Sequence, residues 1–301
     1  MKTQHEKVVL VTGSTDGVGR CVAETLGRAG YTILIHGRDR HRADAVVAGI
    51  KAAGGQATAY LADFSSLADV RLLASGILES HPVIDAVINN AGVGFGQPGE
   101  TRAESKDGHE LRFAVNYLAP FLLTYLLLPG LANGRGRVVN VASVGQAPID
   151  FDDVMLNHDW SGERADRQSK LALIMATFDL ALALRPFGVT VNALHPATFI
   201  PTAMVLESGV ALLSTVREGA DAIVQLVTAP QWHGRSGLYF DGTRPAQAHA
   251  QAYDPEARSR LRVLSFELVR LGHPDEQRGP GVERPGHSHT AAFPSSEDIS
   301  I

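Results

Sequence analysis

A glycine-rich turn near the start of the chain constrains the fold more than any other stretch. Four apolar residues, Val8–Val11, lead into Thr12-Gly-Ser-Thr-Asp-Gly-Val-Gly19, and a helical pattern with Cys21, Val22 and Leu26 follows. A continuous apolar run is typical of a buried parallel strand. Glycines after such a strand permit a tight turn and let the backbone approach a pyrophosphate, which then lies at a helix N-terminus. This order of strand, loop and helix predicts a dinucleotide-binding fold.

Further apolar runs alternate with helical patterns along most of the chain. We predict strands at 8–11, 31–36, 56–61, 83–88, 136–143, 188–195 and 237–241. We predict helices after the glycine loop and over about 40–53, 66–80, 109–131, 163–186, 202–213, 216–228 and 255–271. Strands that alternate with helices form parallel sheets. The predicted fold class is therefore α/β, a single Rossmann-type doubly wound domain whose parallel sheet of about seven strands has helices on both faces.

Composition excludes several classes of protein. The net charge of -5 gives no basic footprint for nucleic acid. The single cysteine, Cys21, excludes an intramolecular disulfide framework and suits a reducing cytosol. No signal peptide is visible, and the most apolar windows, 117–131 and 171–184, are shorter than a membrane span. We expect a cytoplasmic protein with a small-molecule substrate, no nucleic-acid or membrane partner and no metal site. Residues 273–301, rich in Pro, Gly, Ser and charge, predict a disordered tail after a domain spanning 1–272.

The spacing Thr-Gly-x-x-x-Gly-x-Gly resembles the short-chain dehydrogenase/reductase family, and the similarity extends over about 7–241. Asn89-Asn-Ala-Gly92 and Pro196-Ala-Thr198 resemble two further motifs of that family, with Ala197 in place of the usual glycine. The resemblance implies that the cofactor contacts Gly13, Ser14, Thr15, Gly17, Val18 and Gly19 at the pyrophosphate, Asp63 and Phe64 at the adenine, and Asn90, Ala91, Gly92, Lys170, Pro196 and Thr198 toward the riboses and nicotinamide. Asp63 can also cap the helix that follows.

The end of the second predicted strand indicates which cofactor binds. Arg38 lies about 20 residues past the glycine loop, where a dinucleotide fold meets the adenosine ribose. A guanidinium matches the geometry of a 2′-phosphate, so Gly37 and Arg38 favour NADP(H). Two alternatives stay open, since Asp39 can take the ribose role of an NAD site and Arg38 can be a plain surface residue.

In the resembled family a carbonyl and an alcohol are interconverted by hydride transfer, with a Ser, a Tyr, a Lys four residues later and an Asn on an earlier helix. Asn116, Ser143 and Lys170 match these positions, but Asp166 occupies that of the tyrosine. The reference pKa of aspartate is about 3.9 against about 10 for tyrosine. Beside Lys170 at i,i+4 we expect an ion pair that lowers the pKa of Asp166 further. An ionised aspartate does not protonate an alkoxide, so proton donation should be impaired.

Four interpretations of Asp166 follow. The chain is an oxidoreductase that keeps weak or water-mediated turnover, or its scaffold serves NADP-bound chemistry that needs a carboxylate, such as dehydration, isomerisation or cyclisation. In that second case, apolar burial would raise the pKa of Asp166. Alternatively, Asp166 was introduced to disable an ordinary enzyme, or the chain is a non-catalytic NADP-binding protein.

Three other residues are candidates for the missing proton donor. Tyr117 is adjacent to Asn116, but consecutive helical residues do not share a face, so core packing explains it better. His158 and Trp160 lie on a loop that can reach the substrate, and a histidine there could act as an acid near neutral pH. Alternatively, His158 and Trp160 are solvent-facing loop residues without a role in the site.

The segments after the strands suggest the substrate and the assembly. We expect 94–108, 144–162 and 197–213 to shape the substrate pocket, and their composition favours a lipophilic or polycyclic carbonyl or alcohol. Helices 109–131 and 163–186 correspond to the usual subunit surface of the resembled family. A homodimer or homotetramer is therefore expected.

Overall fold

The computed structural model describes residues 7–97, 99–198 and 214–272, and its centre is one eight-stranded sheet in the order β3-β2-β1-β4-β5-β6-β7-β8. The strands are β1 Val8–Val11, β2 Thr32–Gly37, β3 Gln56–Leu61, β4 Ala86–Asn89, β5 Arg137–Val141, β6 Thr190–His195, β7 Tyr239–Asp241 and β8 Arg244–Ala246. All neighbouring pairs are parallel except β7 and β8. The predicted α/β class and mostly parallel sheet are confirmed.

The antiparallel strand β8 was missed by the sequence analysis. It follows β7 through a two-residue turn in which Gly242 has a φ of +56°, the left-handed conformation that favours glycine in tight hairpins. Pro245 lies within β8, where an edge strand tolerates the missing N–H. Three residues with a central proline carry no strand pattern, which is why sequence reasoning ended the sheet at β7.

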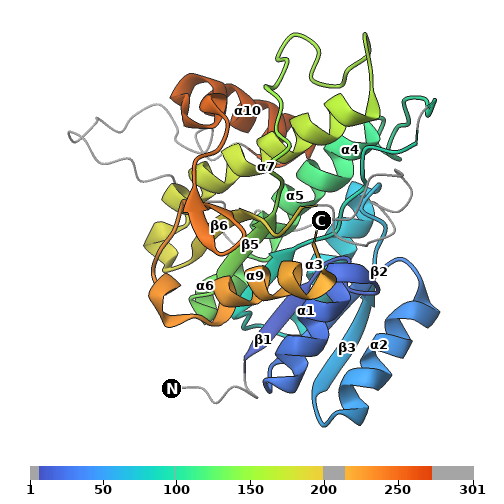
Figure 1. Cartoon of the computed structure of the whole chain (residues 1–301), viewed down its shortest axis with the longest axis vertical. Helices are drawn as coiled ribbons and strands as arrows, with labels where there is room; N and C mark the ends of the chain where they lie inside the picture. The colour runs from blue at the N-terminus through green and yellow to red at the C-terminus, as the bar shows by residue number, and fades with distance from the viewer. Residues whose placement is uncertain (1–6, 98, 199–213, 273–301) are drawn as a thin grey trace.

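Helices connect the strands and cover the sheet (Figure 1). The longer helices are α1 Gly17–Arg28, α2 Arg40–Ala52, α3 Leu67–Ser80, α7 Gly162–Ala183, α9 Val216–Thr228 and α10 Pro255–Leu268. The shorter ones are α4 Leu111–Phe113, the π-helix η2 Ala114–Leu118, α5 Ala119–Leu126, α6 Leu128–Gly134 and the 3-10 turns η3 Arg185–Phe187, η4 Pro230–Trp232 and η5 Ala250–Tyr253. The helix predicted at 202–213 and the tail predicted at 273–301 lie outside the described residues.

The prediction of one helix over 109–131 is wrong in detail. The helical stretch begins at Leu111, where the Glu110 carboxylate accepts the N–H of Phe113 at 2.7 Å. A π-helical turn interrupts it at 114–118, and the chain bends again at Leu127. Pro129 has no N–H to donate and is accommodated in the first turn of α6. Apolar periodicity alone does not reveal such breaks.

Alternating side chains of the strands bury into two cores, one on each face of the sheet. Val9 and Val11 pack with α1, α2 and α9, whereas Leu10 packs with α3, α5 and α7. This alternation follows from the two-residue period of a strand. The faces are therefore covered by different helices, as a doubly wound fold requires.

Helix α10 packs over the side of η2, α5 and α7 that faces away from the sheet (Figure 1). The Tyr117 hydroxyl lies 2.5 Å from Ser265 Oγ, and the Phe121 and Phe266 rings lie 5.5 Å apart. Arg258 Nε donates to Asp179 Oδ1 at 2.8 Å. Helix α10 of the same chain thus covers part of the surface of helices 109–131 and 163–186, which is the surface expected to bind a second subunit.

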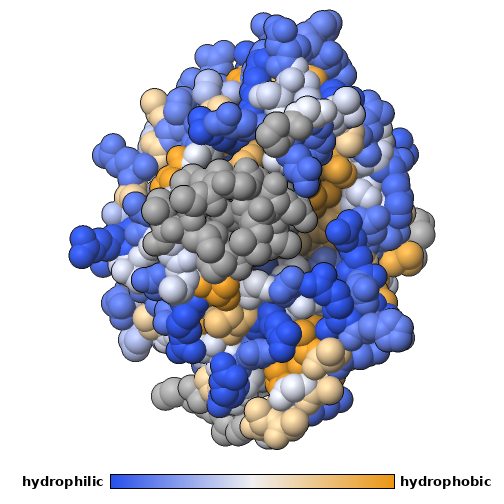
Figure 2. Space-filling model, turned by 45° about the vertical axis from the view of Figure 1, so that its right-hand side comes forward, coloured by the Kyte–Doolittle hydropathy of each residue, from blue (hydrophilic) through white to orange (hydrophobic). Residues whose placement is uncertain are grey.

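The described helices differ in length and in apolar character. None of these helices alone is long and apolar enough to cross a membrane, although the bent pair 111–126 and 128–134, with 61° between its arms, meets the length and composition criteria together. Most of the side chains of α5 are buried in the core. On the face drawn in Figure 2, hydrophilic residues predominate and hydrophobic ones form small separate patches.

Candidate active site

The glycine-rich loop joins β1 to α1 at the carboxyl edge of the sheet. Asp16 caps α1, and its carboxylate accepts the N–H of Gly17 at 2.8 Å. Gly13 has a φ of +63°, and a Cβ there would lie 2.8 Å from Ala91 Cα. A Cβ on Gly19 would overlap the carbonyl oxygen of Gly13. The close approach of these backbone segments therefore requires glycine at both positions.

Asn90 and Thr12 hold this loop against the end of β4. The Asn90 amide Nδ2 donates to the carbonyl oxygens of Thr12 and Gly13 at 3.0 and 3.1 Å. Thr12 Oγ1 accepts the N–H groups of Asn90 and Ala91 at 2.9 and 3.0 Å. One strand further, Asn89 Nδ2 donates to Asn140 Oδ1 at 2.7 Å, so the asparagines tie neighbouring strands together.

The ends of β2 and β3 form the side where adenosine is expected. Arg38 is exposed directly after β2, while the carboxylate of Asp39 accepts the N–H of Arg42 at 3.0 Å and caps α2. Asp63 forms a 3.3 Å ion pair with Lys106 and also accepts the N–H of Ser65 at 3.0 Å. One carboxylate oxygen of Asp39 is therefore engaged in the helix cap, whereas among the described residues the structure gives no such contact for the exposed Arg38.

His36 belongs to this region and was missed by the sequence analysis. Its ring stacks on Phe64 with centroids 4.3 Å apart, Nδ1 accepts the N–H of Gly13 at 3.1 Å, and Nε2 lies 3.2 Å from the carbonyl oxygen of Ala62. Burial lowers the pKa of His36 to about 4. The neutral ring thus joins the glycine loop to the end of β3. A buried histidine within an apolar strand was the available signal.

The proposed catalytic groups come together beside β5. Asn116 lies in the π-helical turn, and π-helical turns are frequent at functional sites. Its Nδ2 lies 3.0 Å from Ser169 Oγ and 3.3 Å from Asp166 Oδ1, while its Oδ1 accepts the N–H of Val93 at 2.7 Å. Lys170 Nζ donates to the carbonyl oxygen at the end of β5, at 3.3 Å.

The electrostatics of Asp166 differ from the sequence-based expectation. Asp166 is half-buried within the protein, and this burial raises its pKa although Lys170 and Arg112 act in the opposite direction. Burial also lowers the pKa of Lys170. Among the described residues, no ion pair joins Asp166 to Lys170, whose ammonium instead contacts Val141. The predicted ion pair and lowered pKa are therefore wrong, because loss of hydration outweighs the attraction.

Ser143 lies just beyond the end of β5, where the sequence predicted it. Its Oγ accepts the N–H of Gly145 at 3.0 Å. Its carbonyl oxygen accepts hydrogen bonds from the Tyr239 hydroxyl at 3.0 Å and from Gln146 Nε2 at 2.9 Å. The backbone of Ser143 is therefore fixed from two sides. After β6, the nearby Thr198 hydroxyl lies 3.0 Å from His195 Nε2.

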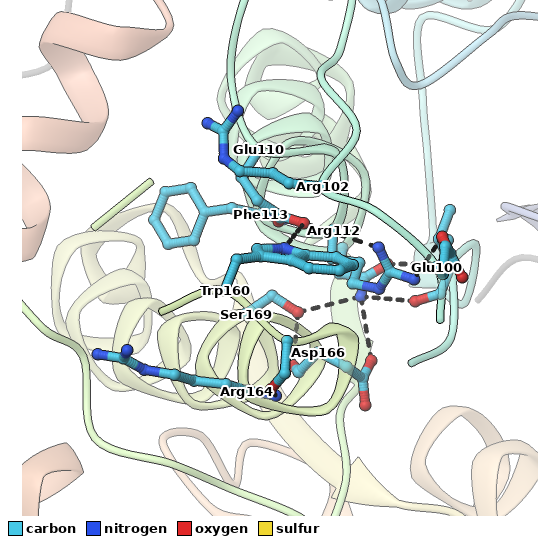
Figure 3. Close-up of polar contacts among 12 residues, drawn as sticks. Glu100, Arg102, Glu110, Arg112, Phe113, Trp160, Arg164, Asp166 and Ser169 are labelled. Carbon is cyan, nitrogen blue, oxygen red and sulfur yellow. Dashed lines mark hydrogen bonds and ion pairs between the residues drawn. The ribbon is translucent and has the colours of Figure 1, made fainter. Parts of the chain in front are cut away.

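A buried arginine joins two of the segments that are expected to shape the substrate pocket (Figure 3). Arg112 is fully buried and donates to the Gly94 carbonyl at 2.7 Å and to Glu100 at 2.9 Å. Its guanidinium carbon lies 5.3 Å from the ring centre of Trp160, whose Nε1 donates to Glu110 at 3.2 Å. Arg112 thus connects the segment after β4 with the segment before α7. A charge within an apolar stretch was a signal that sequence reasoning did not use.

The three alternative proton donors have other surroundings. The Tyr117 ring is fully buried beneath α10, which confirms core packing. His158 is 87% exposed and its Nδ1 lies 3.2 Å from Asp153. Trp160 is held by Glu110 and Arg112. Tyr117 and Trp160 are therefore held by contacts within the protein, whereas His158 faces solvent.

Known proteins are similar to this chain in sequence. A profile of the short chain dehydrogenases matches residues 7–210. The chain is 35% identical to mouse polyprenol dehydrogenase, with 90% of this chain and 86% of that protein covered, and 33% identical to human retinol dehydrogenase 13, with 91% and 88% covered.

Solved structures agree with the sequence comparisons. A metagenomic short-chain oxidoreductase in complex with NADP aligns with a TM-score of 0.63 and 27% identity over 82% of this chain and 100% of that one. A 3-ketoacyl-(acyl-carrier-protein) reductase from Brucella melitensis complexed with NADH aligns with a TM-score of 0.64 and 25% identity over 78% and 96%. The chain therefore belongs to the short-chain dehydrogenase/reductase family.

Proposed function

We propose that this chain is an NADP(H)-dependent oxidoreductase that interconverts a lipophilic alcohol and its carbonyl compound, with Asp166 at the position of the proton donor. The observation that carries the proposal is the arrangement of Asn116, Asp166 and Lys170 beside the end of β5, next to the glycine-rich loop. The names of the polyprenol and retinol dehydrogenases support a long apolar substrate.

The residues around the glycine loop fit a dinucleotide. Gly13 and Gly19 allow the backbone to pack closely, and the N-terminus of α1 favours a pyrophosphate. A Cβ on Gly37 would overlap Thr15 Cγ2, so a larger residue beside Arg38 would have to displace the Thr15 side chain. Arg38 suits the 2′-phosphate of NADP(H), because its exposed guanidinium follows β2 directly and matches a phosphate in charge and geometry, while one oxygen of Asp39 caps α2. One related structure carries NADP and another NADH, so the choice rests on Arg38.

The chemistry assigned to the side chains follows from their positions. Bound NADP(H) would supply the hydride in reduction and accept it in oxidation. Ser143 would orient the substrate oxygen with its hydroxyl, and Lys170 would bind the nicotinamide ribose. Protonated Asp166 would release its proton toward the developing alkoxide, through one water because its side chain is short. The raised pKa of Asp166 supports this role, since a general acid works best when its pKa approaches the operating pH.

Reduction of retinal by the purified full chain tests this proposal. We expect loss of NADPH absorbance and formation of retinol, with a lower rate for NADH. Asp166→Ala should slow the reaction about 10²-fold or more, since that is a typical contribution of general acid catalysis. Asp221→Ala, which removes an exposed carboxylate of α9 that pairs with Arg217 at 2.9 Å, serves as the matched control. Equal rates in the wild type and Asp166→Ala would exclude Asp166 as the proton donor.

A further inference from the structure

The 3-10 turn η5 holds the loop that follows β5 through a single side chain. Gln251 Oε1 accepts the N–H of Ile149 at 2.6 Å, and Gln251 Nε2 donates to the carbonyl oxygen of the same residue at 3.2 Å. One amide thus satisfies both backbone groups of buried Ile149. This turn lies beyond residues 7–210, the part that matches the family profile.

A second connection runs from the same segment to the active site. The N–H of His249 donates to Gln146 Oε1 at 2.7 Å, and Gln146 Nε2 donates to the carbonyl oxygen of Ser143 at 2.9 Å. The side chain of Gln146 therefore bridges the backbone of His249 and the backbone of Ser143 by hydrogen bonds. The segment 249–253 contacts the loop at 146 and 149, on both sides of Pro148.

The segment itself is anchored to α7, the helix that carries Asp166 and Lys170. The carbonyl oxygen of Ala252 accepts a hydrogen bond from Arg258 Nη1 at 3.0 Å, and Arg258 Nε is bonded to Asp179 of α7. The Tyr253 and Phe178 rings lie 5.4 Å apart. Segment 249–253 therefore fixes the loop 143–151 relative to the helix of the catalytic groups.

We propose that Gln251 is a positioning residue that sets the substrate side of the active site by holding loop 143–151. This inference rests on the proposed function for its kinetic consequence, but the hold on the loop is independent of it. Gln251 contacts the loop and not the glycine-rich turn, so its loss should affect the carbonyl substrate and leave NADPH binding unchanged. A net hydrogen bond corresponds to a factor of a few in an equilibrium constant, so we expect the KM for retinal to rise about fivefold.

The test compares Gln251→Met with Gln247→Met in the full chain. Methionine keeps the size of the side chain but removes both hydrogen bonds, and Gln247 is an exposed glutamine four residues earlier. Amide hydrogen exchange is measured for peptides that cover 143–151 and, as an internal reference, for peptides that cover the glycine loop 12–19. Steady-state kinetics then give the KM for retinal and for NADPH.

We expect faster exchange in 143–151 for Gln251→Met, unchanged exchange in 12–19, and a higher KM for retinal at constant kcat and constant KM for NADPH. Equal exchange in 143–151 for the two variants would overturn the proposal, and so would a change in kcat alone. If the wild type does not reduce retinal, the proposed function fails, while the exchange comparison still decides whether Gln251 holds the loop.

Discussion

The side-chain amide of Asn116 lies 3.3 Å from the carboxylate of Asp166 and donates to it. The orientation of this amide is fixed, because its oxygen accepts the N–H of Val93 and its nitrogen also bonds the carbonyl of that residue at 3.0 Å. Asp166 is half-buried, and its Oδ1 accepts this hydrogen bond from Asn116. Whether its carboxyl group carries a proton depends on burial, which raises its pKa, and on Lys170 and Arg112, which lower it.

The pH dependence of reduction should follow the protonation of Asp166. The acid form exists below its raised pKa, so kcat/KM for retinal reduction should be constant below that pKa and fall about tenfold per pH unit above it. Asp166→Asn keeps an acceptor for Asn116 but does not titrate, and it should remove this limb. A falling limb that persists in Asp166→Asn would assign the titration to another group.

The buried ring of His36 should make stability depend on pH. Burial lowers its pKa from 6.5 to about 4, so the folded state binds fewer protons than the unfolded state between these values. The stabilising contribution is complete above 6.5 and is lost as pH falls toward 4, amounting to about 3 kcal/mol. Urea unfolding at several pH values gives the free energy of unfolding as a function of pH. Between pH 4 and 6.5 this free energy should rise less steeply with pH for His36→Gln than for the wild type. His41→Gln, which replaces an exposed histidine, is the control. An equal pH dependence of the unfolding free energy in all three proteins would contradict the assignment to His36.

Arg38 should determine the preference between the two nicotinamide cofactors. Replacing Arg38 by Asp removes a charge-assisted hydrogen bond to the 2′-phosphate, which is typically about 1.5–3 kcal/mol, so NADPH affinity should fall about 10- to 100-fold relative to NADH. Arg40→Asp, two residues later on α2, changes charge equally and should leave the ratio unchanged. Calorimetric titration with both cofactors measures the ratio. An unchanged ratio in Arg38→Asp would refute the phosphate assignment.

The fold was largely predictable because apolar runs and turn glycines are local signals. β3, for example, has the predicted bounds, 56–61. The break of the helix at 114–118 and the edge strand β8 depend on packing and on a proline, which periodicity does not encode. The candidate site also combines features set by local sequence with features set by packing. The residues of the glycine loop could be named from spacing, whereas the direction of the Asp166 pKa shift depends on burial by segments distant in sequence.

An exposed leucine on α7 allows the expected assembly to be tested. A homodimer or homotetramer is expected because helices 109–131 and 163–186 correspond to the usual subunit surface of the family, and α10 covers part of that surface through Ser265 and Phe266. Leu182, 66% exposed on α7, is an apolar residue left for a second subunit. If the homodimer forms there, Leu182→Glu should reduce the mass measured by light scattering from two chains to one. A dimer that survives Leu182→Glu would place the interface elsewhere, and a wild-type mass of 32.1 kDa would contradict the predicted oligomer.

Replacement of Asp166 by tyrosine tests whether this site reduces a carbonyl group. The wild type, Asp166→Tyr and Asp166→Phe are compared for NADPH-dependent reduction of retinal and of polycyclic ketones, with NADPH binding measured for each. Phenylalanine controls for the size of the ring without its hydroxyl. We predict a gain of up to about 10²-fold in Asp166→Tyr and a loss in Asp166→Phe. A general acid contributes about 10²- to 10⁴-fold in total, Asp166 already supplies part of this, and a phenol reaches the substrate oxygen without a bridging water. No gain in Asp166→Tyr, with NADPH bound by all three proteins, would contradict the proposed reduction and point to isomerisation, dehydration or cyclisation.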